Sequence, residues 1–341
     1  MKPLNKSERL PALQMDNVDT ADRALLDGLL DRKLRPLAKA ITLIESQRED
    51  HRARARALLE ALLPHTGAAI RIGISGVPGV GKSTFIEAFG LFLIEQGLRV
   101  AVLAVDPSSS LSGGSILGDK TRMELLSREP AAFIRPSPSA GSLGGVAEKT
   151  REVMLACEAS GFDVIVVETV GVGQSETAVA GMTDLFCLLQ LPNAGDELQA
   201  IKKGVMELAD LIVINKADIS LSAAQTACSH IKTALRMLRP MSPNWPVPVL
   251  TLSALKKEGF AEFWDTVKRY RDTMTASGEL AARRKHQAAM WMWELVDASL
   301  KHRFRQHPRV RAELPGFVAA VEEGRVTPSA AARELLSFLS G

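Results

Sequence analysis

The feature that most constrains this chain is a glycine-rich octapeptide at residues 76–83, with the sequence GVPGVGKS. It satisfies every fixed position of the phosphate-binding pattern G-x-x-x-x-G-K-[ST]. The apolar run 69–75 before it is typical of a buried strand, and residues 84–93 after it have helical apolar spacing. A glycine-rich surface turn, the alternative, does not account for these flanks. The sequence therefore predicts a nucleoside triphosphate site in an α/β protein.

The chemistry of this loop follows from its residue types. Glycines let main-chain N–H groups turn toward an anion, and the following helix adds the positive end of its dipole. Lys82 is expected to reach the β- and γ-phosphate oxygens, and the Ser83 hydroxyl to bind Mg²⁺. The predicted nucleotide-binding residues here are Gly76, Val77, Pro78, Gly79, Val80, Gly81, Lys82, Ser83 and Thr84.

Size and charge place the chain among globular proteins. Its 341 residues, 46% of them hydrophobic, suffice for one large α/β domain with helical additions, or for two small domains. A net charge of +3, from 42 basic and 39 acidic residues, gives no indication of nucleic acid or an anionic membrane as partner. The sequence shows neither an N-terminal signal core nor a run approaching the roughly 20 apolar residues of a membrane span, so we expect a cytoplasmic protein.

The three cysteines, Cys157, Cys187 and Cys228, are widely spaced and odd in number. Two of them lie in apolar surroundings. We therefore expect buried free thiols in a reducing compartment rather than disulfides or a metal site.

Apolar strand-like runs alternate with helical patterns between Ala69 and about Tyr270. This alternation predicts a P-loop NTPase fold of the α/β class, with a mainly parallel, helix-covered sheet. Ligands of such sheets bind at the carboxyl ends of the strands. Besides 69–75, the expected strands are 99–105, 163–168, 184–191, 210–215 and 247–252.

Helical extensions are expected at both ends of the chain. We divide it into a leader and N-terminal helical extension (1–66), a P-loop domain (67–272) and a C-terminal helical extension (273–341). The charge run 48–56 is either a solvated helix face or a docking surface. A long helix over 279–305 carries Trp291 and Trp293, which are either core residues or a dimerisation face, and a last helix is expected to start at Thr327–Pro328.

A second motif, Asn215-Lys216-Ala217-Asp218, predicts which base the nucleotide carries. It directly follows an expected strand. The Asp218 carboxylate can accept hydrogen bonds from N1–H and the exocyclic amine of guanine, whereas adenine has no such donor pair. The expected nucleotide is therefore GTP. Ser253, Ala254 and Leu255, after the last strand, would complete the base pocket with main-chain N–H groups.

Two further segments fit the mobile switches of a nucleotide-dependent protein. Glu168 and Gly171 stand at the end of one strand, where Glu168 could hold Mg²⁺ through water and the Gly171 N–H could sense the γ-phosphate. Val172 takes the usual place of the water-orienting glutamine, for which Gln174 is an unproven substitute, so slow intrinsic hydrolysis is expected.

Asp106 and Asp119 lie in the other segment, a loop rich in hydroxyls and glycines. They fit a first switch around Mg²⁺, with a capped surface loop as the alternative. A further Gly/Ser-rich run at 136–145 is another mobile element or a linker.

Together these motifs closely resemble the MeaB/ArgK GTPases, bacterial relatives of the human methylmalonic aciduria type A protein. The resemblance extends from about Leu37 to Leu300. One departure is Ser110-Leu111-Ser112, where relatives often have Thr-x-Thr. The segments that carry the resemblance are GVPGVGKST (76–84), VDPSSS with GGSILGDKTRM (105–123), FIRPSPS (133–139), ETVGVGQSE (168–176), GDELQAIKKG (195–204) and NKAD (215–218).

The resemblance implies a GTPase chaperone of an adenosylcobalamin-dependent acyl-CoA mutase that gates cofactor delivery and protects the mutase. It implies a homodimer formed through the C-terminal helices. The run 191–202 resembles the family's third switch, which includes Asp196 and Glu197 and couples the mutase to hydrolysis, and Lys202 resembles a lysine that helps position the nucleotide. The implied metal shell is Ser83, Asp106, Asp119 and Glu168, and the implied catalytic residues are Lys82, Glu168, Gly171 and Lys202.

Three other functions compete with this interpretation. A nickel-type metal-insertion GTPase shares the fold, but it needs His- or Cys-rich clusters, and six scattered histidines do not supply them. A protein kinase of the ArgK type needs a base for an acceptor hydroxyl, which no motif identifies. A nucleotide-dependent scaffold without useful hydrolysis stays open because the usual glutamine is missing.

Overall fold

A computed structural model describes residues 19–105, 123–136, 143–169, 175–192, 203–238 and 241–340. The chain divides into two compact units, residues 1–284 and 285–341. The first unit holds the sheet, and the second holds helices only. The division falls inside one long helix, α12 (Glu279–Gln306).

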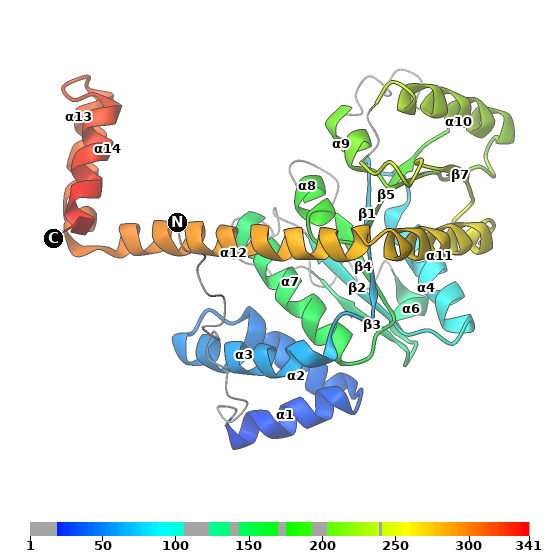
Figure 1. Cartoon of the computed structure of the whole chain (residues 1–341), viewed down its shortest axis with the longest axis horizontal. Coiled ribbons are helices and arrows are strands. Elements are labelled where there is room, and N and C mark those ends of the chain that lie inside the picture. The colour runs from blue at the N-terminus through cyan, green and yellow to red at the C-terminus, as the bar shows by residue number, and fades with distance from the viewer. Residues whose placement is uncertain are drawn as a thin grey trace, which may run out of the picture. The chain divides into compact units, whose positions relative to one another are not determined.

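Seven parallel strands form the central sheet of the first unit, in the order β3-β2-β4-β1-β5-β6-β7 (Figure 1). The α/β fold with a parallel, helix-covered sheet is thereby confirmed. Strands β2, β4, β5 and β6 are buried along their whole length, as expected when helices cover both faces. The strands are β1 (Ile70–Gly76), β2 (Val100–Val105), β3 (Ala132–Arg135), β4 (Val164–Thr169), β5 (Leu185–Gln190), β6 (Leu211–Ile214) and β7 (Val249–Thr251).

Strand β3 was not expected from the sequence. It has four residues and pairs with β2 alone, at the edge of the sheet. So short a run carries little periodicity of its own. Its pairing with β2 through Val100↔Ala132 and Leu103↔Arg135 depends on the tertiary structure.

Alternate side chains of β2, β4, β5 and β6 enter two separate hydrophobic clusters, one on each face of the sheet, and Ile70, Ile72 and Ile74 of β1 enter one of them. On one face, α4 and α11 meet through aromatic rings, with Phe85–Phe263 and Phe89–Phe263 centroids 5.1 and 4.9 Å apart, both edge-on. This packing fixes α4, the helix that follows the phosphate-binding loop. The helices of the sheet domain are α4 (Lys82–Glu95), α6 (Glu124–Ser127), α7 (Leu143–Ala159), α8 (Ser175–Ala180), α9 (Lys203–Leu208), α10 (Leu221–Leu235) and α11 (Phe260–Ala276).

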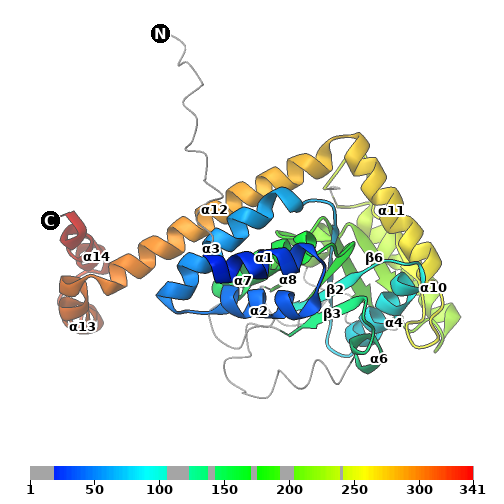
Figure 2. The same cartoon turned by 90° about the horizontal axis from the view of Figure 1, so that it is seen from below.

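The N-terminal extension, expected to be helical within residues 1–66, consists of three helices and a short 3₁₀ turn. All three helices contact α7, and Figure 2 shows them beside it. Leu37, Ile41 and Leu58 are fully buried and belong to the same hydrophobic cluster as the sheet residues. The extension is thus continuous with the core of the first unit. Its elements are α1 (Thr20–Leu30), α2 (Leu34–Glu45), α3 (Glu49–Leu62) and η2 (Leu63–His65).

The second unit comprises most of α12, α13 (Pro308–Glu322), α14 (Pro328–Ser337) and η3 (Phe338–Ser340). The expected start of the last helix is confirmed, because the Thr327 side chain accepts a hydrogen bond from the Ala330 N–H at 3.3 Å. Helix α13 was not expected; Val310 from this helix packs with Leu335 and Phe338. In the described part of the chain, no helix is both long and apolar enough to cross a membrane.

Candidate nucleotide site

The predicted phosphate-binding loop connects the end of β1 to the start of α4. Gly81 stands immediately before the first turn of α4 with φ +95°, a conformation that favours glycine. A Cβ at Gly81 would also lie 2.9 Å from the Asn215 Nδ2 atom. The loop therefore needs glycine here for both its backbone and its neighbour.

Lys82 is the first residue of α4, and its side chain folds back over the loop. The Nζ atom donates a hydrogen bond to the Gly76 carbonyl at 2.8 Å and approaches the Val77 carbonyl at 3.4 Å. The ammonium group is thus held at the mouth of the loop, where main-chain N–H groups and the dipole of α4 also favour an anion.

Ser83 and Glu168, predicted as metal ligands from distant parts of the sequence, meet beside the loop. The Ser83 hydroxyl donates to the Glu168 Oε1 atom at 3.4 Å, and Glu168 is only 7% exposed. The next residue, Thr169, donates its hydroxyl to that of Ser75 at 2.9 Å, which ties β4 to β1. A hydroxyl next to a buried carboxylate is a donor set suited to a hard cation such as Mg²⁺.

Asn215 connects three parts of the site. Its Nδ2 atom donates to the Val80 carbonyl of the phosphate-binding loop at 2.8 Å, and its Oδ1 atom accepts from the Ala254 N–H at 3.0 Å. Asn215 is 1% exposed, so both hydrogen bonds are shielded from water. The sequence places Asn215 at the base, but its contact with the loop was not predicted.

Lys216 also reaches the phosphate-binding loop. Its Nζ atom donates to the Gly79 carbonyl at 2.8 Å, and its backbone has φ +61°, a conformation that non-glycine residues seldom adopt. The segments that follow β6 and β1 are thereby joined by two side chains, those of Asn215 and Lys216.

Asp218, at the end of the N-K-x-D segment, contacts Ser253, which follows β7. The Ser253 hydroxyl donates to the Asp218 Oδ1 atom at 2.5 Å and accepts from the Lys256 N–H at 3.2 Å. Ala254 is buried, and Leu255 is 77% exposed. The structure thus brings the two predicted base-reading segments, 215–218 and 253–255, side by side.

Several predicted site residues lie outside the described residues. They include both carboxylates of the first switch, the glycine of the second switch and the residues assigned to the third switch. Among the residues that the structure describes, no group of three or more His, Cys, Asp or Glu side chains is placed to hold a metal ion. The predicted residues outside the described ranges are Asp106, Asp119, Gly171, Asp196, Glu197 and Lys202.

A buried charge cluster at the amino ends of β5 and β6 was not predicted from the sequence. Asp184 and Asp210 directly precede β5 and β6, with side chains 1% and 3% exposed, and they pair with Arg284 and Arg283. The Asp210 Oδ2 atom also accepts from the Phe186 N–H at 2.9 Å. Burial alone would lower the pKa of the Arg283 guanidinium, but its hydrogen bond and ion pair with Asp210 outweigh this effect and raise the pKa.

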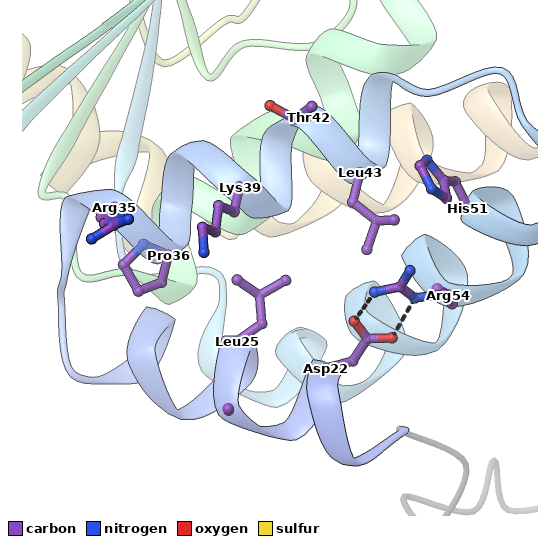
Figure 3. Close-up of a pocket in the computed structure, with 10 residues that line it drawn as sticks. Asp22, Leu25, Arg35, Pro36, Lys39, Thr42, Leu43, His51 and Arg54 are labelled. Atoms are coloured by element: carbon purple, nitrogen blue, oxygen red, sulfur yellow. Dashed lines mark hydrogen bonds and ion pairs between the residues drawn. The ribbon is translucent and has the colours of Figure 1, made fainter.

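The charge run of the N-terminal extension is partly solvated and partly structural. Arg48 pairs with Asp50 at 2.7 Å, and both side chains are more than half exposed. Arg54 instead reaches Asp22 of α1 in a bidentate ion pair of 2.9 and 2.8 Å, beside a cavity of about 660 Å³ between α1, α2 and α3 (Figure 3). The buried Asp22 carboxylate thereby ties α1 to α3.

The fold and these contacts define a class of protein: a P-loop nucleoside triphosphatase with the phosphate-binding loop after β1 and an N-K-x-D segment after β6. The family model of the methylmalonyl-CoA mutase-associated GTPase MeaB matches residues 37–309. The chain belongs to the MeaB family and is a GTPase.

Known proteins agree with this assignment over nearly the whole chain. A protein of Caulobacter vibrioides named as a GTPase is 56% identical over 328 residues, which cover 96% of this chain and 98% of the relative. The mitochondrial methylmalonic aciduria type A homolog of Mus musculus is 48% identical, over 92% of this chain and 78% of the relative. A crystal structure of a LAO/AO transport system kinase matches with a TM-score of 0.76 and 39% identity, over 95% of this chain and 99% of that one.

Proposed function

We propose that this GTPase is a chaperone of an adenosylcobalamin-dependent acyl-CoA mutase, which gates cofactor delivery to the mutase and protects it. The structural observation that supports the nucleotide-dependent part of the proposal is Asn215, whose side chain joins the phosphate-binding loop to the base-reading segment. Such a junction lets one nucleotide be held by its phosphates and its base at once. The family's name supplies the association with a mutase.

Guanine selection is assigned to Asp218 and Ser253. The Asp218 carboxylate would accept the two N–H donors of guanine, and the Ser253 hydroxyl, now 2.5 Å from it, would orient it. The Ala254 and Leu255 N–H groups are assigned to the guanine oxygen, for which the Ala254 N–H would give up its bond to the Asn215 Oδ1 atom. Against ATP the Asp218 side chain would stay unpaired, which disfavours adenine.

Mg²⁺ is assigned to Ser83 and Glu168, whose oxygens lie 3.4 Å apart beside the loop. When bound, the ion would neutralise charge on the phosphate oxygens. Lys82 would leave the Gly76 carbonyl to pair with the phosphates, and the main-chain N–H groups of the loop would hold them in place. Asp106 and Asp119 are proposed to complete the metal shell.

Hydrolysis by the protein alone is proposed to be slow. The residue after Gly171 is valine, so the side chain that orients the attacking water is missing from its usual place. We assign acceleration to the third switch, with Asp196, Glu197 and Lys202 acting when a mutase binds. The protein is further proposed to be a cytoplasmic homodimer that uses the C-terminal helices.

The test is GTP hydrolysis by the purified protein, alone and with each cobalamin-dependent acyl-CoA mutase of the same organism. We expect a basal rate below about 1 s⁻¹, at the low end of the usual enzyme range, and a clear increase with one mutase. A fast basal rate would remove the need for a stimulating partner. No increase with any mutase would contradict the chaperone assignment.

A kinase activity is the second candidate, favoured by the similarity to a protein named as a LAO/AO transport system kinase. The same experiment separates the two if the γ-phosphate is radiolabelled. Label released as inorganic phosphate supports the GTPase chaperone, whereas label on a protein acceptor supports the kinase. A metal-insertion role would instead require stoichiometric nickel binding, which equilibrium dialysis measures.

A further inference from the structure

An apolar groove lies between α9, the C-terminal end of α10 and the chain segment that leads to β7. In Figure 1 these elements lie together at the end of the sheet that holds β7. The groove has a volume of about 410 Å³, within the range of about 300–1,000 Å³ that binding pockets occupy. Its apolar lining includes Met206, Leu235, Leu238 and Met241.

The groove presents adaptable apolar surface to its surroundings. Met241 is 59% exposed, and Leu235 and Leu238 are half-buried against the core beneath them. Methionine has a flexible, polarizable side chain that adjusts to different apolar partners. A lining of this kind suits an inserted apolar side chain better than a fixed polar ligand.

The rim of the groove is positively charged. Lys232, in the last turn of α10, and Arg236, the residue that follows this helix, line the groove and are exposed. Within the described ranges neither of them forms an ion pair. Glu207 is the acidic residue of the lining, so the two cations outnumber it. The occupant should therefore carry carboxylates next to its apolar side chains.

The groove is also next to the elements that follow the predicted switches. Helix α9 begins at Lys203, one residue after Lys202, and its residue Met206 is buried in the groove lining. Helix α9 in turn contacts α8, which begins at Ser175, just after the predicted second switch. A molecule seated in the groove would thus contact the helix that continues directly from the third switch.

We propose that this groove docks an apolar segment of the mutase flanked by acidic residues, and that the mutase stimulates hydrolysis through this contact with α9. The inference rests on the proposed chaperone function and names the surface that the function uses. Contact at Met206 would shift the position of α9. Because α9 begins directly after Lys202, this shift would also change the position of Lys202. Stimulation would then require no mutase residue in the nucleotide site.

The test uses the full-length protein, the stimulating mutase and three charge variants. In Met241→Glu a carboxylate enters the groove, and in Lys232→Glu the sign of the rim is reversed. Met237→Glu is the matched control, because Met237 follows the C-terminal end of α10 by two residues, is 83% exposed and does not line the groove. GTP hydrolysis is measured against mutase concentration, and thermal midpoints confirm folding.

We expect Met241→Glu to raise the mutase concentration for half-maximal stimulation at least about tenfold, as disruption of a central contact does, and Lys232→Glu to raise it about threefold, because its charge lies at the rim. Basal hydrolysis and the response of Met237→Glu should match the wild type. Wild-type stimulation in both groove variants would overturn the groove and leave the chaperone function standing. An equal loss in Met237→Glu would also overturn the groove, because the effect would then come from charge anywhere on this surface. Failure of every mutase to stimulate the wild type would overturn the chaperone function and this inference with it.

Discussion

Arg284 and Asp184 form a bidentate ion pair although 100 residues separate them, with Nε–Oδ1 and Nη2–Oδ2 distances of 2.7 and 2.6 Å. The same guanidinium donates to the carbonyls of Gly67 and Ala69, both at 2.7 Å, just before β1. Asp184 also accepts from the Arg71 N–H at 2.9 Å. One arginine thereby joins the starts of β1 and β5 to the end of the first unit.

Replacement of Arg284 by methionine should destabilise the first unit by about 3–5 kcal/mol, because it leaves the buried Asp184 carboxylate without its cation. The hydrogen bond to Asp184 raises the pKa of Arg284, so the guanidinium stays charged throughout the neutral range. Urea unfolding followed by Trp fluorescence measures the change.

The matched control is Lys33→Met, which breaks an ion pair whose side chains are 63% and 62% exposed. The control should change stability by less than about 1 kcal/mol. Similar losses in the two variants would contradict the prediction.

The sequence predicted those parts of the fold whose signal is local. Buried β-branched runs such as 163–168 mark strands, and Thr327–Pro328 marks a helix start. Strand β3 was missed because four residues carry little periodicity, and α13 because Pro308 and Pro315 mask its helical pattern. The pairing of Arg284 with Asp184 has no local sequence signal, because it depends on where the start of α12 packs.

The candidate site divides in the same way. Lys82, Ser83, Glu168 and Asp218 were found by motif, since spacing and strand context define them. The strands are parallel, so their carboxyl ends lie on the same side of the sheet. This arrangement explains why Ser83 lies next to Glu168, and Asp218 next to Ser253. The contacts of Asn215 and Lys216 with the phosphate-binding loop depend on the path of the loop itself, which the motif does not specify.

Asn215→Ala should weaken both the fold and nucleotide binding. The buried Val80 carbonyl and Ala254 N–H would lose their partner, and each such loss costs about 1–3 kcal/mol. We expect a lower thermal midpoint and at least about tenfold weaker binding of a fluorescent GTP analogue. Asn244→Ala is the control, because Asn244 is exposed and bonds to the half-buried Glu279, and it should leave both measurements unchanged. Normal affinity in Asn215→Ala would separate Asn215 from the nucleotide site.

The cysteines should differ in reactivity. All three are free; Cys157 and Cys187 are fully buried, and burial raises the pKa of both thiols well above the usual range. The thiolate is the reactive form, so an aromatic disulfide reagent should label at most the half-buried Cys228 in the native protein. Three labelled thiols are expected after unfolding. Rapid labelling of two thiols in the native state would contradict the burial of Cys157 or Cys187.

Asp218→Asn should shift the preference from GTP toward xanthosine triphosphate. An amide keeps one oxygen that can accept from N1–H, but its NH₂ group then faces the exocyclic amine of guanine donor to donor, whereas it can donate to the extra oxygen of xanthine. We expect at least about a tenfold loss of GTP affinity and a gain for the xanthine nucleotide, both measured by calorimetry with Mg²⁺. Asp272→Asn, an exposed position on α11, controls for the loss of one charge. An unchanged preference would remove Asp218 from the base site.

Lys202→Ala should separate nucleotide binding from stimulation by the mutase. The assignment of Lys202 to the third switch comes from its resemblance to the family, and the phosphates would already be held by Lys82 and the loop N–H groups. GTP affinity should therefore fall less than about threefold, while the increase in hydrolysis caused by the mutase is lost. Single-turnover hydrolysis with saturating mutase measures this effect, since it is independent of product release.

Lys203→Ala, which removes the same charge one residue later, is the control and should keep the stimulation. Stimulation retained in Lys202→Ala would assign the coupling to another residue. Loss in both variants would indicate that net charge in this stretch, rather than one positioned ammonium group, supports hydrolysis.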